Sequence, residues 1–174
     1  MGVAGSGKSV QGKLLAQDLG YTWLSTGELL RQSVDKKRQK EMLEGKLLND
    51  QEIIDMMGQF FQKQKDNKAC ILDGFPRTLP QATWLLEEHD KGVIRLDAVI
   101  YLQASKEVVK ERLLSRGRLD DTKEAIDKRF KEYEQATLPI VDWLKKKNIP
   151  VIEIDGEAEI EEINAAILKN IKEL

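Results

Sequence analysis

This sequence contains very few of the side chains that form disulfides or bind soft metals. It has a single cysteine, Cys70, and a single histidine, His89. One cysteine cannot form an internal disulfide framework or a multi-cysteine zinc site, and one histidine cannot form a histidine cluster around a metal. Only four prolines occur, and 41% of the residues are apolar and 33% charged. This composition is typical of a folded, helix-rich protein and argues against disorder.

Long hydrophobic runs are also missing, because the strongly apolar stretches extend over only a few residues. We therefore expect no membrane-spanning segment. The first residues are rich in glycine and show no basic stretch followed by a long apolar run, so we expect no signal peptide. These absences favour a reduced, cytoplasmic setting.

Positive charge is not in excess, since 28 lysines and arginines face 30 aspartates and glutamates, for a net charge of −2. A broad basic surface for duplex nucleic acid is therefore not indicated. An anionic ligand would have to be bound by a local cluster of positive charge.

The chain has 174 residues, which suits one α/β domain with one core. Short apolar runs alternate with longer amphipathic stretches, and this alternation predicts a mostly parallel sheet covered by helices on both faces. In such sheets ligands bind beyond the carboxyl ends of the strands. The predicted strands are 21–24, 69–72, 98–102 and 151–154. The predicted helices are 8–19, 27–44, 50–65, 78–90, 105–116, 121–147 and 158–173. Pro139 lies inside the range 121–147, so we expect this helix to break near Thr137.

A phosphate-binding loop is the clearest motif. Residues 2–9 read Gly-Val-Ala-Gly-Ser-Gly-Lys-Ser and fit the pattern G-x-x-x-x-G-K-[ST] without a mismatch. Backbone N–H groups of such a loop converge on a phosphate, Lys8 supplies a mobile positive charge, and Ser9 offers a hydroxyl toward Mg²⁺. Because this loop normally follows a buried strand, we expect an apolar strand immediately before Gly2.

Further candidate residues follow the ends of two predicted strands. The apolar run 69–72 ends at Asp73, whose carboxylate can help to hold the metal through water. Arg31 and Arg77 have planar guanidinium groups suited to a bidentate grip on a monophosphate. Gln81 has one donor face and one acceptor face, which can read the edge of a base.

Four arginines are close together in the second half of the chain: Arg112, Arg116, Arg118 and Arg129. The first two are four residues apart and share one face of a helix. In a chain of net charge −2, such a cluster indicates an anion site. The alternative is a set of surface salt bridges with neighbouring glutamates, each of which would contribute little.

Several of these motifs together resemble the adenylate kinases and the wider nucleoside monophosphate kinase family. The matching segments are GSGK with Gln11, STGELLR, EGKLLND, DGFPRTLPQA, ERLLSRGRLDD and the region of Arg129, in the order the family has them. The resemblance implies a three-layer P-loop NTPase sandwich, a parallel sheet flanked by helices, with a helical monophosphate-binding insertion. It also implies a single domain over 1–174, with a monophosphate-binding segment at about 25–54 and a vestigial lid at about 116–120.

The same resemblance implies an ATP:AMP phosphotransferase that uses Mg²⁺ and gives two ADP, acting as a monomer on small nucleotides. It assigns catalytic roles to Lys8, Arg77, Arg116, Arg118 and Arg129. It assigns ATP to Gly5, Ser6, Gly7, Lys8, Ser9, Val10, Arg112, Arg116 and Ala158. It assigns AMP to Thr26, Arg31, Lys46, Leu47, Leu48, Gly74, Phe75, Pro76, Arg77, Gln81, Arg118 and Arg129. It assigns the metal to Ser9 and Asp73.

Two departures from the family pattern affect the interpretation. The family usually has Gly-Lys-Gly-Thr where this chain has Gly-Lys-Ser-Val, so Val10 lacks a hydroxyl that Ser9 would replace. Only Gly117 separates Arg116 from Arg118, which predicts a minimal lid. Three alternatives stay open: a UMP/CMP or other monophosphate kinase, a P-loop kinase for a small metabolite, and a nucleotide-binding module without turnover. The resemblance implies threonine at the position of Thr26 in adenylate kinases and alanine in UMP/CMP kinases, which favours AMP over pyrimidine monophosphates.

Overall fold

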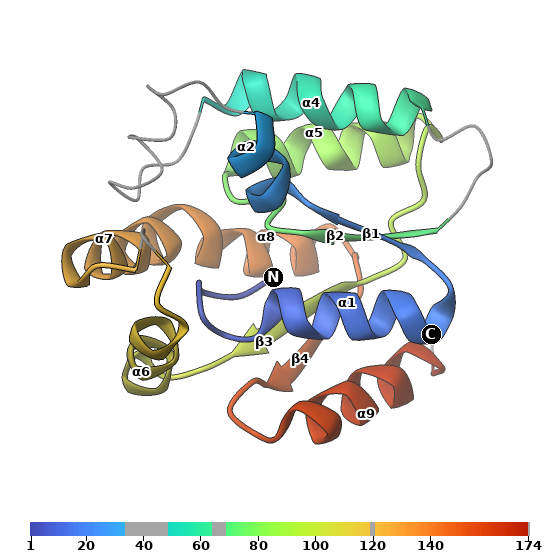
Figure 1. Cartoon of the computed structure of the whole chain (residues 1–174). Helices are drawn as coiled ribbons and strands as arrows, with labels where there is room; N and C mark the ends of the chain where they lie inside the picture. The colour runs from blue at the N-terminus through green and yellow to red at the C-terminus, as the bar shows by residue number, and fades with distance from the viewer. Residues whose placement is uncertain (34–48, 64–68, 119–120, 174) are drawn as a thin grey trace.

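We describe the protein from a computed structural model, which covers residues 1–33, 49–63, 69–118 and 121–173. Four short strands alternate with helices along the chain (Figure 1). The strands are β1 (Thr22–Ser25), β2 (Cys70–Asp73), β3 (Val99–Gln103) and β4 (Val151–Asp155). All four predicted strands are confirmed to within one residue at each end.

The helices follow the predicted order. They are α1 (Lys8–Leu19), α2 (Thr26–Ser33), α4 (Asp50–Lys63), α5 (Leu79–Asp90), α6 (Lys106–Arg116), α7 (Lys123–Glu132), α8 (Leu138–Lys146) and α9 (Ile160–Ile171). The part of the predicted helix 27–44 beyond residue 33 lies outside the described residues. No helix in the described ranges is both long and apolar enough to cross a membrane.

The expected break near Thr137 is confirmed, and it takes the form of a wider turn. A single π-helical turn, η1, spans Tyr133–Thr137 between α7 and α8. Pro139 lies in the first turn of α8, where its missing N–H costs no hydrogen bond. Thr122 caps α7 by accepting from the backbone N–H of Ala125 at 3.2 Å, so the preceding residue Asp121 does not fill this position. The Asp121 side chain instead binds arginines.

The strands form two parallel pairs. In one pair Thr22 is in register with Cys70, and in the other Val99 is in register with Val151. In the described part of the chain no strand is hydrogen-bonded to both β2 and β3. The main chain of Met1 lies along β3, where its carbonyl accepts from the N–H of Leu102 at 2.9 Å and its nitrogen donates to the carbonyl of Ile100. The two strands of each pair therefore run parallel, with their carboxyl ends at the same edge, as the alternation predicted.

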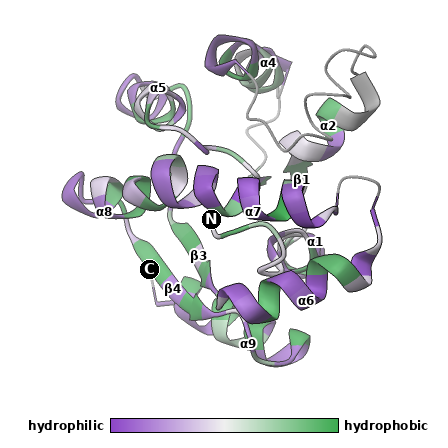
Figure 2. Ribbon diagram, turned by 90° about the vertical axis from the view of Figure 1, so that its left-hand side faces the viewer, coloured by the Kyte–Doolittle hydropathy of each residue, from purple (hydrophilic) through white to green (hydrophobic). Residues whose placement is uncertain are grey.

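Helices cover the strands on opposite sides and bury the core. Leu15 of α1, Leu102 of β3 and Ile167 of α9 pack in one cluster, while Val99 of β3 packs against Leu144 of α8 in another. Figure 2 shows the resulting arrangement, with hydrophobic β3 and β4 lying between amphipathic helices. A third cluster joins β1 to α4 and α5, and a fourth joins the phosphate loop to α6 and α7. These contacts fix the loops that follow the strands.

Candidate active site

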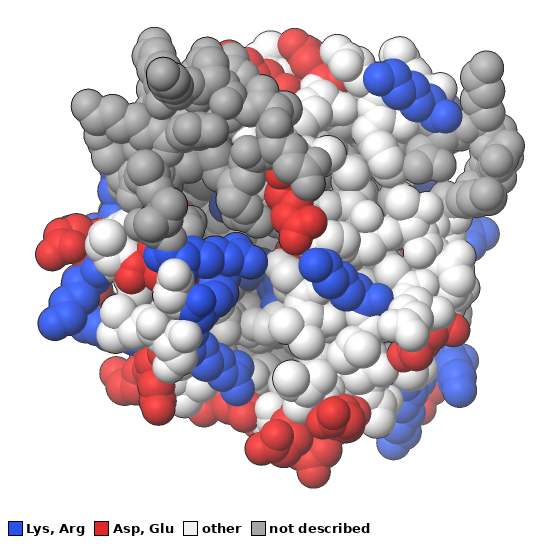
Figure 3. Space-filling model, in the orientation of Figure 1, with Lys and Arg blue, Asp and Glu red and all other residues white. Residues whose placement is uncertain are grey.

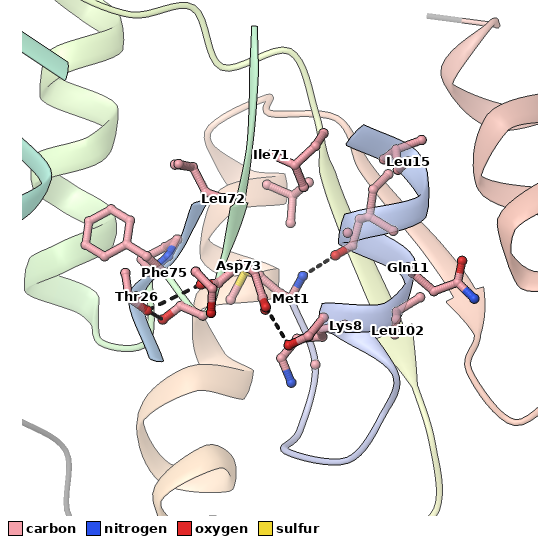
Figure 4. A pocket seen from close by; sticks show the side chains of 18 of the residues that line it. Met1, Lys8, Gln11, Leu15, Thr26, Ile71, Leu72, Asp73, Phe75 and Leu102 are labelled. Carbon is pink, nitrogen blue, oxygen red and sulfur yellow. Dashed lines mark hydrogen bonds between the residues drawn. The ribbon is translucent and has the colours of Figure 1, made fainter. Parts of the chain in front are cut away.

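A cavity of about 1980 Å³ extends from the glycine-rich loop along β2 and β3 to the loops after the strands. Figure 4 shows Lys8 at the start of α1 close to Asp73 at the end of β2, with Thr26 and Phe75 beyond them. The structure brings most predicted site residues to this cavity: Gly5, Gly7, Lys8, Ser9, Val10, Thr26, Asp73, Gly74, Phe75, Pro76, Arg77, Gln81, Arg112, Arg116, Arg118, Arg129 and Ala158 line it. The end of the cavity at the loops after the strands thus lies where a doubly covered parallel sheet is expected to bind its ligand.

Five further predicted residues are not among the described residues that line this cavity. Ser6 is buried inside the loop, and its hydroxyl has no hydrogen-bond partner. Arg31 lies on α2, the helix that follows β1, as predicted. Lys46, Leu47 and Leu48 lie outside the described residues, as do residues 119–120 of the expected lid. Their assignments stay predictions.

The glycine-rich loop leaves the start of α1 open to an anion. Gly5 and Gly7 have φ angles of 89° and 94°, which a residue with a Cβ rarely adopts. Gly7 caps α1 without a side-chain hydrogen bond, so the first N–H groups of the helix can bind phosphate oxygens. The loop therefore combines converging N–H donors with the positive end of a helix dipole.

The Lys8 ammonium turns back onto the loop, where it donates to the carbonyl oxygen of Val3 at 2.5 Å. Burial lowers the pKa of Lys8 to about 7, the charge of Asp73 opposes this shift, and those of Arg77 and Arg116 add to it. A bound polyphosphate would supply a negatively charged partner for this ammonium. Lys8 is thus placed to pair with a phosphate group.

Ser9 and Asp73 form a pair of oxygen ligands at the cavity. The Ser9 hydroxyl donates to Oδ2 of Asp73 at 2.6 Å, and Asp73 is only 6% exposed. Hydroxyl and carboxylate oxygens are the ligands that Mg²⁺ prefers, with water completing its shell. In the described ranges no three metal-binding side chains of His, Cys, Asp or Glu come together. The pair therefore fits a Mg²⁺ ion that keeps several waters and contacts the bound phosphates.

The loop after β2 is held by short contacts to β1 and α2. The Thr26 hydroxyl donates to the carbonyl of Gly74 at 2.9 Å, and Nε of Arg77 donates to the same carbonyl at 2.7 Å. Gly74 has a φ of 81°, and a Cβ there would lie 2.8 Å from both Thr26 Oγ1 and Arg77 Nη2. Only glycine fits this position without moving the two side chains that the sequence assigned to the acceptor.

Residues that sequence reasoning overlooked support this loop. Thr137, at the end of the π-helical turn, donates its hydroxyl to the carbonyl of Arg77 at 2.7 Å. Asp50, the first residue of α4, accepts from the Thr78 hydroxyl at 2.6 Å and from Nε2 of Gln81 at 2.8 Å. Asp50 belongs to the EGKLLND segment, so the motif contained the residue but gave no indication of its partner. These contacts link two helices to the acceptor loop.

The arginine cluster converges on one buried carboxylate. Arg116 forms a bidentate pair with Asp121, with N–O distances of 2.8 and 2.6 Å, and Arg129 binds Oδ1 of Asp121 at 3.2 Å. The backbone N–H of Arg118 also faces Asp121 at 3.3 Å, and the Asp121 side chain is 1% exposed. Figure 3 shows lysine and arginine side chains gathered over α6 and α7 at the edge of the hollow. The cluster is therefore an organised group and not a set of unrelated surface pairs.

The pKa of Asp121 reflects these partners. Burial by itself would raise the pKa, but hydrogen bonds and positive charge from Arg116, the N–H of Arg118 and the charge of Arg129 outweigh it. The net pKa lies below its ordinary value of 3.8. Asp121 therefore carries a negative charge at neutral pH and holds the two guanidinium groups at the mouth of the cavity.

Arg112 lies in another wall of the cavity. Its guanidinium donates to the carbonyl of Gly156 at 2.6 Å and to that of Glu157 at 3.2 Å. Gly156 is itself tied to β3 by its N–H, which donates to Gln103 at 2.7 Å. Arg112 and the segment that ends at Ala158 thus form one side of the cavity, next to the phosphate loop. The family resemblance assigns this side to the nucleotide base, and that assignment stays a prediction.

Comparison with known proteins gives a consistent result over nearly the whole chain. The family model "Adenylate kinase" matches residues 1–149. An adenylate kinase of Corynebacterium urealyticum is 36% identical over 174 aligned residues, covering 97% of this chain and 94% of the relative. One of Prochlorococcus marinus is 35% identical, covering 96% of this chain and 93% of the relative. One of Porphyromonas gingivalis is 38% identical, covering 93% and 88%.

Proposed function

This chain belongs to the adenylate kinase family, and from that premise we propose how its cavity divides ATP and AMP between two sets of residues. The chain is an enzyme, a nucleotide-binding kinase that transfers a phosphoryl group. ATP is the proposed donor and AMP the proposed acceptor, and the product is two molecules of ADP. The observation that carries the assignment is the position of the acceptor loop 74–77 opposite the phosphate loop across one cavity.

The donor nucleotide is assigned to the phosphate loop and the wall beside it. The N–H groups of residues 5–10 bind the polyphosphate, and Lys8 exchanges the Val3 carbonyl for phosphate oxygens. Arg112 and Ala158 line the same side of the cavity, where the adenine would lie. The proposed position of the terminal phosphate is therefore at the carboxyl ends of the strands, near Asp73.

The acceptor is assigned to the loop after β2 and to the segment after β1. Arg77 binds the monophosphate, assisted by Arg31, and Phe75 provides an apolar wall. Gln81 is assigned to the base, and the assignments of residues 46–48, which lie outside the described part, stay predictions. The 25–54 region is thus the proposed monophosphate-binding segment.

Phosphoryl transfer between these two sites needs positioning and charge neutralisation more than covalent help from the protein. Lys8, Arg116, Arg118 and Arg129 provide positive charge around the transferring group, and we assign no general base. Ser9 and Asp73 would hold Mg²⁺, which when bound neutralises phosphate charge. The lid about 116–120 is short, so the ends of α6 and α7 themselves deliver the arginines.

A spectrophotometric assay that couples ADP production to NADH oxidation tests the assignment. We expect turnover with ATP and AMP, dependent on Mg²⁺, and much lower turnover with CMP or UMP. Higher activity with CMP or UMP would move the assignment to a pyrimidine monophosphate kinase. Turnover only with a small metabolite, or none at all, would contradict it. Gel filtration with light scattering tests the proposed monomer. The cytoplasmic setting is also a proposal.

Arg77→Ala is expected to weaken AMP binding by about tenfold to a hundredfold, because a charged hydrogen bond of this kind contributes roughly 1.5–3 kcal/mol. ATP binding should change little, since the phosphate loop is unaffected. Calorimetric titration with each nucleotide separately measures both constants. Arg95→Ala is a suitable control, because Arg95 is 83% exposed and its described ion-pair partner is the exposed Asp97. Equal losses for the two nucleotides would show that Arg77 is assigned to the wrong site.

We also propose that an apolar extended strand between β2 and β3 completes the sheet. Each pair has an unpaired edge in the described part of the chain, and Met1 already lies in the ladder of β3. Ile100 lines the space between the pairs, as do Ile71 and Leu102, which Figure 4 shows. Burying about three apolar side chains there contributes roughly 2–3 kcal/mol each, against about 1–2 kcal/mol of ordering per residue. A strand in this place would form backbone hydrogen bonds on both sides.

Extending the chain before Met1 with five alternating valine and isoleucine residues tests this proposal. We expect the thermal midpoint to rise by about 5 °C, which corresponds to roughly 1–2 kcal/mol in a protein of this size. Binding of a hydrophobic dye should decrease, because the space between β2 and β3 is filled. A five-residue glycine and serine extension is the control. Equal midpoints for the two extensions would contradict the proposed strand.

A further inference from the structure

Gln81 is held at both ends by groups whose hydrogen-bonding character cannot change. Its Nε2 donates to Oδ1 of Asp50 at 2.8 Å, and its Oε1 accepts from the backbone N–H of Arg77 at 2.8 Å. Gln81 is only 3% exposed and lines the cavity on the acceptor side. Asp50 is in turn fixed by the hydroxyl of Thr78, which donates to the same Oδ1 at 2.6 Å. The side-chain amide therefore lies in a closed network between α4 and α5.

This network allows only one orientation of the amide. A carboxylate can only accept a hydrogen bond, and a backbone N–H can only donate one. Turning the amide by 180° would place its oxygen against the Asp50 carboxylate and its NH₂ group against the N–H of Arg77. Both contacts would be repulsive, so the NH₂ end faces Asp50 and the oxygen faces Arg77. One N–H and one lone pair of the amide are then left over, each at a known end.

The orientation of those two groups decides which purine edge they fit. A 6-aminopurine presents a donor at N6 and an acceptor at N1. A 6-oxopurine presents the reverse, an acceptor at O6 and a donor at N1. An amide with fixed ends complements one pattern and opposes the other, because a mismatched pair leaves two buried polar groups unsatisfied.

We propose that Asp50 is a specificity-determining positioning residue, which sets the orientation of the Gln81 amide and so makes the acceptor site prefer a 6-aminopurine to a 6-oxopurine monophosphate. The inference rests on the proposed function, in which Gln81 faces the acceptor base. Asp50 acts through Gln81 and takes no part in phosphoryl transfer. Its position at the first turn of α4 also ties the monophosphate-binding segment to α5.

The test compares AMP with IMP as acceptors in the full chain. Asp50→Asn keeps the size of the side chain and can still accept from Thr78, but its amide can also turn its NH₂ group toward Gln81. Only the N–H of Arg77 then opposes rotation of the Gln81 amide. We expect the ratio of kcat/KM for AMP to that for IMP to fall about tenfold or more. The change should appear mainly in KM for the monophosphates, with KM for ATP unaltered.

Asp55→Asn is a matched control, because Asp55 lies on the same helix and accepts from a glutamine amide, that of Gln51, at 2.8 Å on the exposed surface. Its AMP to IMP ratio should equal that of the wild type. Asp50→Ser is a second variant that removes the Asp50 carboxylate. A serine hydroxyl both donates and accepts hydrogen bonds, and serine suits the start of a helix. Thr78→Val removes one hydrogen bond to Asp50 and the cap that accepts from the backbone N–H of Gln81, but it leaves the carboxylate facing the Gln81 amide. It should lower stability and keep the ratio.

The outcomes separate three possibilities. An unchanged ratio in both Asp50 variants, or an equal fall in Thr78→Val, would mean that Asp50 only ties the helices together, and would overturn the proposal. Gln81→Ala is expected to raise KM for AMP and to remove most of the preference over IMP. If it leaves KM for AMP unaltered, Gln81 does not face the base and this inference fails, whereas turnover of AMP by the wild type would still support the proposed function.

Discussion

Replacing Lys8 with alanine is expected to reduce the rate of phosphoryl transfer by at least about a hundredfold, the usual effect of removing one preorganised donor from a site where charge is redistributed. The Lys8 side chain contacts the Val3 carbonyl and faces the cavity, so its removal opens no hole in the hydrophobic core. The protein should therefore stay folded. Initial rates from the ADP-coupled assay and circular dichroism measure the two effects.

The stability of the Lys8 variant gives a second check through its dependence on pH. The folded pKa of Lys8, about 7, lies below its ordinary value of 10.5. Between these values the unfolded chain binds more protons than the folded one, so wild-type stability should rise with pH across this window. In Lys8→Ala that rise should be smaller. Urea denaturation at pH 7 and pH 10 measures it.

Lys13→Ala is the control for both measurements. Lys13 lies on the same helix, its side chain is 56% exposed, and it contacts Trp23 and Glu28 at the surface. Transfer should stay near the wild-type rate in this variant. Undiminished transfer in Lys8→Ala would show that residues 2–9 do not bind the transferred phosphate.

The sequence predicted those parts of the fold that depend on local pattern. Each strand is a short apolar run, and the carboxyl end of β2 carries Asp73, so the strand and its functional residue were both visible in residues 69–73. The phosphate loop was equally clear, because residues 2–9 match its motif without a mismatch. Its glycines at positions 5 and 7 have positive φ angles, which other residues rarely adopt. The break at Thr137 followed from Pro139 alone.

What the sequence could not predict are contacts between residues far apart in the chain. Asp50 and Gln81 are separated by 31 positions, and nothing near Asp50 indicates that its carboxylate faces an amide on another helix. Asp121 presented a different difficulty, since an aspartate just before a helix is a normal cap. Thr122 took that role, which left the Asp121 carboxylate for Arg116 and Arg129. Tertiary packing decided between two locally acceptable uses of the same residue.

Replacing Asp121 with asparagine is the second substitution for which we expect a large fall in the rate of phosphoryl transfer. Asp121→Asn removes the negative charge that holds two guanidinium groups together at the mouth of the cavity. Without it the like charges of Arg116 and Arg129 repel each other, and their side chains lose a fixed geometry. Because a displacement of about 1 Å in a positioning group can cost a hundredfold in rate, we expect kcat to fall by about that factor. ATP binding, which depends on the phosphate loop, should change far less.

Stopped-flow or steady-state kinetics and calorimetry separate these two effects, with Asp127→Asn as the control. Asp127 lies on the neighbouring helix α7, its side chain is 53% exposed, and it is 3.9 Å from Lys106. A loss of ATP binding as large as the loss of kcat would mean that the cluster holds the donor and does not position the transferring group.

Acid unfolding gives an independent measure of the same carboxylate. The folded pKa of Asp121 is depressed, so its contribution to stability is complete above the ordinary value of 3.8 and is lost as the pH falls through the lower folded value. An asparagine cannot titrate, so the stability of Asp121→Asn should be lower at neutral pH and should decline less steeply below pH 4. If the wild type and the variant lose stability in parallel on acidification, the charge of Asp121 does not organise the arginines. The effect of the substitution on kcat would then need another cause.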